Sequence, residues 1–249
     1  MRETCLVYLE SMASPIARPA TQRLLEFVAL AAFLAYATGL QGRVAFAFES
    51  SGDMLVLLAG VVCGYFTADL ISGVAHWMGD RLGHETTPII GAIFIAPFRE
   101  HHDDPQEMVS HGLLELVGNT AVFALPSLAA AYYLLEFEPG SGWALFSGGL
   151  ILSAMMGVVA TNIFHRWAHM ERPPYIGRIL QGAGLVLTRE HHARHHAGSF
   201  DRAYCITTGW MDRPLDRLRV WEQIECLLGR DRRKQEFSAE VGPQSDPSD

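Results

Sequence analysis

The stretch Met54–Asp80, MLVLLAGVVCGYFTADLISGVAHWMGD, decides the fold. Its apolar part, Met54–Ser72, contains a single charged side chain, Asp69. A helix rises about 1.5 Å per residue, so ~20 residues cross the ~30 Å hydrocarbon core of a bilayer. His76 and Asp80 follow four residues apart, on one face of the same helix if the helix continues. The stretch therefore predicts a membrane span that carries two metal-ligand side chains just beyond its end.

Three other apolar stretches are also long enough to cross a bilayer: Leu24–Leu40, Leu113–Leu135 and Trp143–Phe164. Leu24–Leu40 is at the short limit for a span, and a buried amphipathic helix is the alternative for it. Pro126 falls inside Leu113–Leu135, where a membrane helix tolerates it with a kink. The fold class that follows is an all-α membrane protein with about four transmembrane helices and a histidine-rich, metal-binding cap.

Two shorter apolar pieces, Ile89–Phe98 and Tyr175–Leu187, are too short to span a membrane and predict interfacial or re-entrant segments.

The sequence predicts one domain with a segment at each end. Residues 1–23 form an N-terminal segment, residues 24–229 the membrane and metal-binding domain, and residues 230–249 a disordered tail, because Ser238–Asp249 is polar with two prolines.

Charge and histidine positions predict the orientation of the four spans. With four spans, every Lys and Arg except Arg43 falls on the side of the termini, which the positive-inside rule makes cytoplasmic. All 11 histidines lie in two segments, His76–His111 and His165–His196, on that same side. We therefore expect an integral, multi-pass membrane protein with both termini and both histidine segments in the cytoplasm.

Composition excludes several classes of protein. The net charge of −8 makes nucleic acid an improbable partner. The four cysteines are scattered without a CxxC pair, which excludes a disulfide scaffold, a zinc ribbon and a thioredoxin-like centre.

The histidines follow a helical spacing. Five pairs are four residues apart: His76 and Asp80, His111 and Glu115, His165 and His169, His191 and His195, His192 and His196. Residues at this spacing share a helix face and reach a common ion. His101 and His102 are adjacent, so we expect their rings to take different orientations.

The segment His191-His192-Ala193-Arg194-His195-His196 is the strongest metal signal. Four imidazoles in six residues would repel one another if protonated, and a metal ion resolves this by binding the neutral form. The donors are too numerous for one structural zinc. We expect two metal ions, held by a set drawn from His76, Asp80, His101, His102, His111, His165, His169, His191, His192, His195 and His196.

The donor set does not decide which metal binds, because imidazole suits zinc, iron, copper and nickel. A pair of redox-active irons at the membrane surface is the preferred interpretation, since iron can activate O₂ and remove hydrogen from an unactivated C–H bond. The alternatives are a lipid hydroxylase with the same centre, a zinc-dependent membrane lipid hydrolase and a haem protein. Haem is disfavoured because the histidines lie at span ends.

Four motifs resemble the plasmanylethanolamine desaturase family, the Kua-like or lipid desaturase domain proteins. They are Asp69–Asp80, Pro97–Pro105 (PFREHHDDP), Asn162–His169 (NIFHRWAH), and His191–His196 followed by Tyr204–Trp210 (YCITTGW). The resemblance covers roughly Asp69 to Gly229. This chain departs from the usual pattern at Arg81-Leu82, Gly112 and Thr188, which affects the expected substrate more than the expected reaction.

The resemblance implies a non-haem di-iron site, O₂ as co-substrate and electrons from an external donor of ferredoxin or cytochrome b5 type. The implied reaction converts the alkyl ether chain of a plasmanyl phospholipid, plasmanylethanolamine, to the vinyl ether of a plasmalogen. A plastid branch of the family acts on acyl chains, so a fatty-acyl desaturase is the alternative. The implied partners are a membrane phospholipid and an electron-donor protein.

Other residues are expected around the ligands. Asp69, Glu115 and Asn162 are candidates to support ligands by hydrogen bonds. The candidates to contact lipid are Arg99, Trp77, Trp167 and Arg189, with ordinary positive-inside charges or interfacial aromatic residues as the alternative. His84 matches no family histidine and is expected on the surface.

Overall fold

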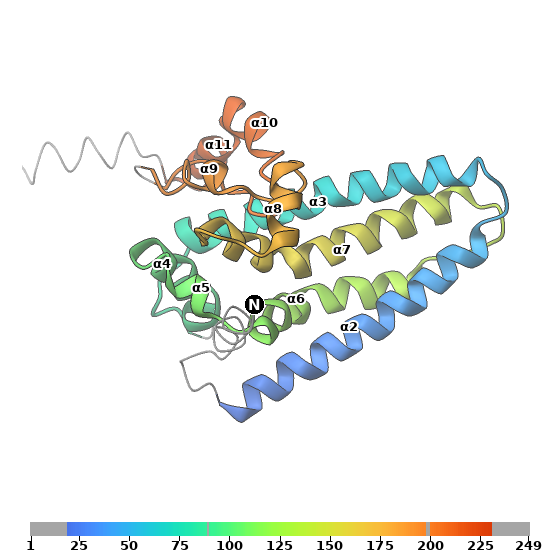
Figure 1. Cartoon of the computed structure of the whole chain (residues 1–249), viewed down its shortest axis with the longest axis horizontal. Coiled ribbons are helices and arrows are strands. Elements are labelled where there is room, and N and C mark those ends of the chain that lie inside the picture. Colours follow the sequence, from blue (N-terminus) through green and yellow to red (C-terminus); the bar gives the residue numbers. More distant parts are fainter. Residues whose placement is uncertain (1–18, 89, 198–199, 231–249) are drawn as a thin grey trace, which may run out of the picture.

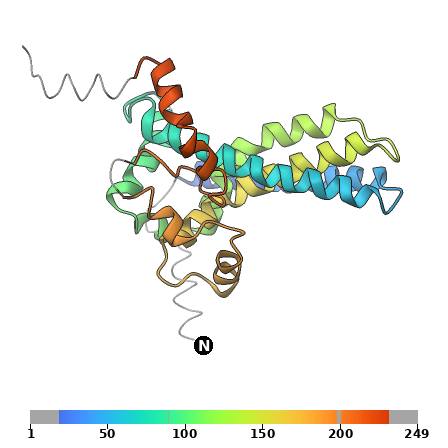
Figure 2. The same ribbon diagram turned by 90° about the horizontal axis from the view of Figure 1, so that it is seen from above.

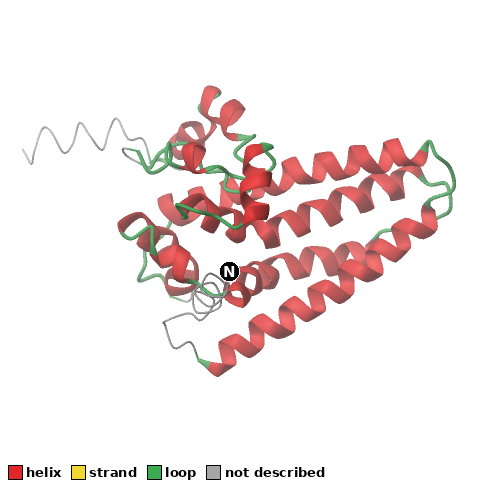
Figure 3. Cartoon of the chain, in the orientation of Figure 1, coloured by secondary structure: helices red, strands yellow, loops and turns green. Residues whose placement is uncertain are grey.

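The computed structural model describes residues 19–88, 90–197 and 200–230, and within these residues it is helical without a strand (Figure 3). Four long helices form the bundle: α2 (Ala20–Ala47), α3 (Asp53–Arg81), α6 (Leu113–Leu134) and α7 (Gly142–His169). Each is long and apolar enough to cross a membrane, with a mean hydropathy of 1.5 to 2.0 over an apolar stretch of 18 residues. The predicted all-α membrane fold with four spans is confirmed.

The remaining elements are short and form the cap, which we define as residues 82–112 and 170–230. It consists of the π-helical turn η1 (Gly91–Ile95) and the helices α4 (Ala96–Asp103), α5 (Glu107–Ser110), α8 (Tyr175–Gly182), α9 (Arg189–His192), α10 (Asp212–Arg217) and α11 (Val220–Leu227). Figure 1 and Figure 2 show the α2–α3 and α6–α7 connections at one end of the bundle and the cap at the other.

Helices α3 and α7 pack closely because small residues line their contact. A Cβ atom at Gly60 would lie 2.3 Å from the carbonyl oxygen of Phe146, and one at Gly64 would lie 2.2 Å from that of Leu150. Small residues let membrane helices approach at the backbone. On the other side of the bundle, Phe33 and Leu40 of α2 pack with Leu128 of α6 in one buried cluster. This packing fixes the ends of α3 and α7 side by side.

The two ligand-bearing helices extend past their apolar parts. Helix α3 continues beyond Ser72 to Arg81, and α7 continues beyond Phe164 to His169. Ser141 starts α7 by accepting a hydrogen bond from the backbone N–H of Ala144. Both histidine segments therefore lie at the cap end, as the four-span prediction requires, and the side of the membrane they face stays a prediction.

The two short apolar pieces form helical turns of the cap. The described part of Ile89–Phe98 contains η1 and the start of α4, and Tyr175–Leu187 contains α8. Pro126 lies inside α6, which continues through it. The first 18 residues and the predicted tail beyond Arg230 lie outside the described residues.

Candidate metal centre

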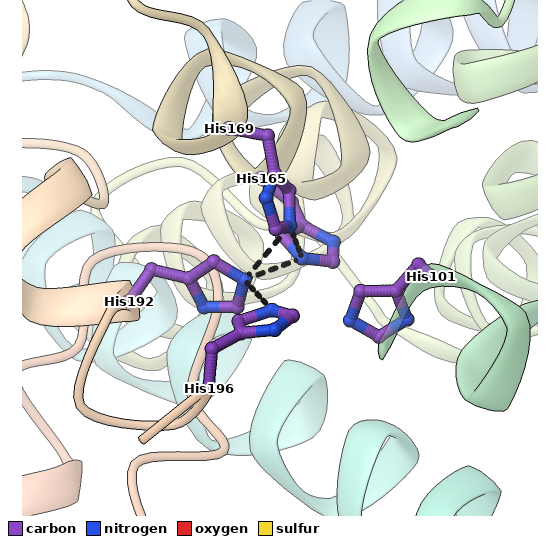
Figure 4. A group of neighbouring side chains, drawn as sticks. All are labelled: His101, His165, His169, His192 and His196. Carbon is purple, nitrogen blue, oxygen red and sulfur yellow. Dashed lines mark hydrogen bonds between the residues drawn. The ribbon is translucent and has the colours of Figure 1, made fainter. Parts of the chain in front are cut away.

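Five imidazoles converge at the cap end of α7, and we call them the five-histidine cluster. His165 and His169 lie one turn apart on α7, and the other three come from the cap: His101 on α4, His192 on α9, and His196 in the turn after α9. Figure 4 shows the rings directed toward one another. One ring nitrogen from each lies within 4.8 Å of the others.

The nitrogen distances in this cluster indicate a cation. The Nε2 atoms of His165, His169 and His192 lie 2.9, 3.0 and 3.1 Å apart in pairs. A neutral imidazole nitrogen either carries a proton or presents a lone pair, so two of any three must be in the same state. At least one of the three contacts is therefore repulsive without an ion. A metal that accepts all three lone pairs removes the repulsion.

A second group adjoins the first, and we call it the aspartate cluster: His76 and Asp80 of α3, His102 of α4, and His195. The Nε2 atoms of His102 and His195 are 2.9 Å apart. The carboxylate oxygen Oδ2 of Asp80 lies 3.4 Å from Nε2 of His76 and 3.3 Å from Nε2 of His195. Three imidazoles and a carboxylate thus surround one point.

Backbone carbonyls fix two rings of the aspartate cluster. Nδ1 of His76 donates to the carbonyl oxygen of Tyr204 at 3.0 Å, and Nδ1 of His195 donates to that of Arg202 at 2.8 Å. With the proton on Nδ1, each Nε2 presents its lone pair to the cluster, which is the arrangement of metal-bound histidines. Both buried oxygens of Asp80 lack a hydrogen-bond donor among the described residues. The arrangement fits a metal ion.

Burial keeps four of the cap histidines neutral, namely His101, His102, His192 and His196. It is the main cause that lowers the pKa of His102 and of His196 to about 3, and neighbouring imidazoles add to it. The pKa of His101 and of His192 is lowered as well, mainly by burial. These rings are therefore uncharged at pH 7, the form that binds a metal.

The two clusters are close enough to form one centre. The ring centroids of His101 and His102 are 4.3 Å apart, and those of His76 and His165 are 5.8 Å apart. Eight imidazoles and one carboxylate suit a transition metal such as iron or zinc, and they do not suit Mg²⁺ or Ca²⁺, which take oxygen ligands. The residues fit a pair of such ions.

The structure leaves two expected ligands, His111 and His191, outside both clusters. Nδ1 of His111 contacts the carboxylate of Glu115 across the break between α5 and α6. Nε2 of His191 lies 2.6 Å from Oδ2 of Asp212, and Arg194 also contacts the ring. The His191 ring therefore pairs with Asp212, while His195, four residues later, belongs to the aspartate cluster.

The three expected supporting residues hold other groups. The carboxylate of Asp69 accepts the backbone N–H groups of Thr208, Gly209 and Met211 at 2.7 to 2.9 Å, so it ties the 207–211 segment to α3 and contacts no imidazole. Asn162 donates to the carbonyl of Leu116 at 3.4 Å. Glu115 binds His111 as described.

Four residues were expected to contact lipid. None of them lines the cavity that is described in the next paragraph. Trp77 is buried, stacks on Trp221 and donates to Glu225 at 3.3 Å. Arg99 donates to the carbonyl of Gly83 at 3.2 Å, and Trp167 packs on Phe164 and Gly177. Arg189 is exposed at the start of α9, and His84 is exposed as expected.

A cavity of about 400 Å³ opens beside the five-histidine cluster. His101 and His165 form part of its wall. Its apolar lining comes from Ile71, Phe94, Phe98, Leu116, Phe123 and Val158, and its polar lining includes Glu100, Glu107, His111, Glu115 and Asn162. A mixed lining of this size suits part of an amphipathic small molecule. Asn162 and the His111–Glu115 pair therefore face the cavity rather than the ligands.

Two further residues that the sequence did not single out contact histidines of this region: Asp212 contacts His191, and Phe200 contacts the ligand His102. Asp212, which is buried, receives the backbone N–H of Cys205 at 2.8 Å as well as the His191 ring. Phe200 stacks on His102 with ring centroids 4.1 Å apart. No spacing pattern marks either residue, because each lies far in sequence from the ring that it contacts.

Comparison with known proteins identifies the family of this chain. The family model described as the lipid desaturase domain matches residues 65–235, which is most of the chain. The chain belongs to the lipid desaturase domain family. The resemblance inferred from the sequence motifs is therefore confirmed, and with it the assignment to a family of desaturases, which are oxidoreductases. No solved structure matches the chain.

Curated relatives share substantial identity with this chain. It is 36% identical over 206 residues to plasmanylethanolamine desaturase of Myxococcus xanthus, which covers 83% of this chain and 72% of the relative. It is 36% identical over 180 residues to mouse plasmanylethanolamine desaturase 1, covering 70% of this chain and 65% of the relative. Fatty acid desaturase 4, chloroplastic, of Arabidopsis thaliana is 32% identical over 187 residues, with coverages of 73% and 54%.

Proposed function

We propose that this protein is an O₂-dependent di-iron desaturase that converts the alkyl ether chain of a plasmanyl phospholipid to a vinyl ether. One observation carries the proposal: two adjoining ligand clusters lie at the end of a membrane bundle, and the five-histidine cluster forms part of the wall of a mixed polar and apolar cavity. The named activities of the Myxococcus and mouse relatives support the ether lipid as substrate.

The overall reaction sets what the site must supply. An –O–CH₂–CH₂– unit becomes –O–CH=CH–, and O₂ becomes two waters. The substrate provides two electrons and two hydrogens, so two further electrons and two protons must come from elsewhere. Bound iron would supply the O₂ activation that no side chain provides. In the aspartate cluster it would be held by His76, Asp80, His102 and His195, and in the five-histidine cluster by His101, His165, His169, His192 and His196.

The apolar and the polar residues of the cavity would contact different parts of the substrate. Phe94, Phe123 and Val158 form an apolar wall that holds an alkyl chain and keeps water from the reacting carbons. Asn162 and the His111–Glu115 pair provide polar groups on the same cavity. The carbons that form a vinyl ether adjoin the glycerol, so their site needs polar and apolar contacts together. A site at the cap end of the bundle offers both.

The fatty acid desaturase named among the relatives supports a second candidate, an acyl desaturase with the same centre. Lipid analysis separates the two. We expect acid-labile vinyl ethers in ether-lipid-containing cells that express this chain, and none in cells that express His192→Ala. New acyl double bonds without vinyl ethers would favour the second candidate. Amide or ester cleavage by a zinc-loaded protein, with neither product, would contradict both.

A further inference from the structure

Both asparagines of this chain line the cavity beside the five-histidine cluster. The 249 residues include two asparagines, Asn119 and Asn162, and the cavity wall contains both. Asn119 belongs to α6 and Asn162 to α7, two helices that are long and apolar enough to cross a membrane. Polar side chains within a span are costly, and they commonly mark a functional site. We therefore expect the two carboxamides to bind a polar group in the cavity.

The hydroxyl groups of the cavity wall are already bound within the protein. Ser72 accepts the backbone N–H of Ile206 at 3.0 Å and donates within α3 at 2.7 Å. Thr120 donates to backbone carbonyls of α6 and α7 at 3.0 to 3.1 Å. Thr161 and Thr207 bond to each other at 2.6 Å. These hydroxyls hold the fold together and leave the carboxamides as the uncharged polar groups that can bind a ligand.

The two carboxamides have hydrogen-bonding capacity to spare. Nδ2 of Asn162 donates to the carbonyl of Leu116 at 3.4 Å, beyond the usual range of about 2.7–3.2 Å. Asn119 makes no side-chain hydrogen bond with any residue that the structure describes. Each carboxamide offers two N–H donors and one acceptor oxygen. Donors of both side chains are therefore available to a molecule in the cavity.

The cavity is arranged in layers along α6 and α7. Phe123 and Val158 lie one helical turn farther from the cap than Asn119 and Asn162, at a spacing of four residues in each helix. His165 lies three residues from Asn162 in the opposite direction, toward the cap. Residues three or four apart share a helix face, and all five line the same cavity. The carboxamides consequently lie between the apolar end of the cavity and a ring of the five-histidine cluster.

This order matches the order of groups in a phospholipid, whose glycerol oxygens lie between the headgroup and the hydrocarbon chains. Asn162 lies two residues before the end of the apolar stretch Trp143–Phe164, at the corresponding edge of the membrane. An ether oxygen carries no proton, so only a hydrogen-bond donor binds it. Among the described residues, the cavity wall contains no lysine or arginine. The carboxamide N–H groups are the neutral donors that suit such an oxygen.

We propose that Asn119 and Asn162 donate hydrogen bonds to the ether oxygen of the substrate and thereby determine which two carbons are dehydrogenated. This inference rests on the proposed function and names the residues that position its substrate. An alkyl chain is uniform along its length, so apolar contacts alone do not fix its register, whereas the ether oxygen occurs once. Three residues of helix rise about 4.5 Å. An oxygen held at Asn162 therefore keeps the two adjoining carbons within about one helical turn of His165.

Lipid binding to the iron-loaded protein, kept free of O₂ so that no turnover occurs, tests the hydrogen bonds. The probes are a plasmanyl phosphatidylethanolamine and a deuterium-labelled analogue with CH₂ in place of the ether oxygen, and native mass spectrometry measures their competition. We expect wild-type protein to prefer the ether lipid by about threefold to tenfold, the effect of a net hydrogen bond. N119L/N162L, in which the side chains keep a similar size, should show no preference.

Thr120→Val is the matched control, because it removes a hydroxyl that is bonded within the protein, and it should keep the wild-type preference. If N119L/N162L loses iron, N119L alone repeats the comparison, since α6 carries none of the cluster ligands. A preference equal to that of wild-type protein in the variant that retains iron would overturn the inference.

The position of the product double bond tests the register in the active protein. In N162L we expect kcat/KM to fall about tenfold, and part of the product to carry its double bond farther along the chain, where it is stable to acid. A residue that only packs would lower the yield without moving the double bond, so vinyl ether as the sole product of N162L would also overturn the inference. An ether preference that the variants lose, in a protein that forms no vinyl ether, would instead contradict the proposed function alone.

Discussion

The two ligand clusters differ in composition, support and surroundings. The five-histidine cluster contains imidazole only, and Nδ1 of His165 and of His192 has no hydrogen-bond partner among the described residues. The aspartate cluster contains a carboxylate, and backbone carbonyls orient His76 and His195. The first cluster faces the cavity, and the second adjoins Phe200.

This difference concerns how firmly the rings of each cluster are held and which cluster borders the cavity. Carbonyl-anchored rings are held in one tautomer and orientation, which fixes the position of the lone pairs that they present to a metal. Rings without such an anchor are held mainly by their neighbours and by the ion. A substrate in the cavity would therefore meet the five-histidine cluster, through His101 and His165.

Loss of the central ligand of the five-histidine cluster should have the largest effect. Nε2 of His192 lies within 3.0 Å of Nε2 in His165, His169 and His196. In His192→Ala we expect desaturation to fall by about 10³-fold or more, because an ion that carries the chemistry is lost. Product analysis and iron content measure this in protein that still reaches the membrane. His84→Ala, at an exposed histidine, is the control, and full activity in His192→Ala would refute the site.

Asp80→Asn should separate the two clusters. It keeps the side-chain shape and removes the charge from the aspartate cluster, whose metal affinity we expect to fall by more than about tenfold. Iron content should decrease from two ions to one per chain after mild chelation, because the five-histidine cluster is untouched. Mössbauer spectra of the remaining iron would show whether it is still part of a pair. Simultaneous loss of both ions would mean that the clusters are one indivisible site.

A bulky residue in the cavity should affect the substrate and leave the metals in place. Ala75 lines the cavity, one residue before the ligand His76. In Ala75→Phe we expect kcat/KM to fall about tenfold, since an extra ring costs ~1–3 kcal/mol in a filled space. Val74→Phe places the same ring at an exposed position of the same turn and should be nearly silent. Equal activities of the two variants would show that the substrate does not occupy this cavity.

His191→Gln should have the smallest effect. His191 lies next to a central ligand in sequence but pairs with the buried Asp212. Losing a charged hydrogen bond should cost about 1–3 kcal/mol of stability, a decrease in Tm of several degrees. Iron content should remain at two per chain. A loss of iron would show that His191 is a metal ligand and would contradict its position outside both clusters.

The sequence predicted the parts of the site that lie on long helices. His76 with Asp80, and His165 with His169, take the predicted positions because α3 and α7 run through the membrane boundary without a break. Hydropathy and a spacing of four residues were sufficient there.

Prediction failed where the chain leaves regular helix. His191 and His195 have the same spacing as His192 and His196, but the His191 ring pairs with Asp212 and lies outside both clusters. Trp77 was expected near lipid and instead lies under Trp221, a contact between residues far apart in sequence. The cavity combines side chains of α3, α4, α6 and α7, so no local pattern contained it.

Metal analysis of the purified protein tests the central claim most directly. Elemental mass spectrometry, with Mössbauer spectroscopy of the same ⁵⁷Fe-enriched sample, would count the ions and show whether they interact. The account predicts two irons per chain in one coupled pair. A single ion per chain, or zinc in both clusters of an active desaturase, would contradict it.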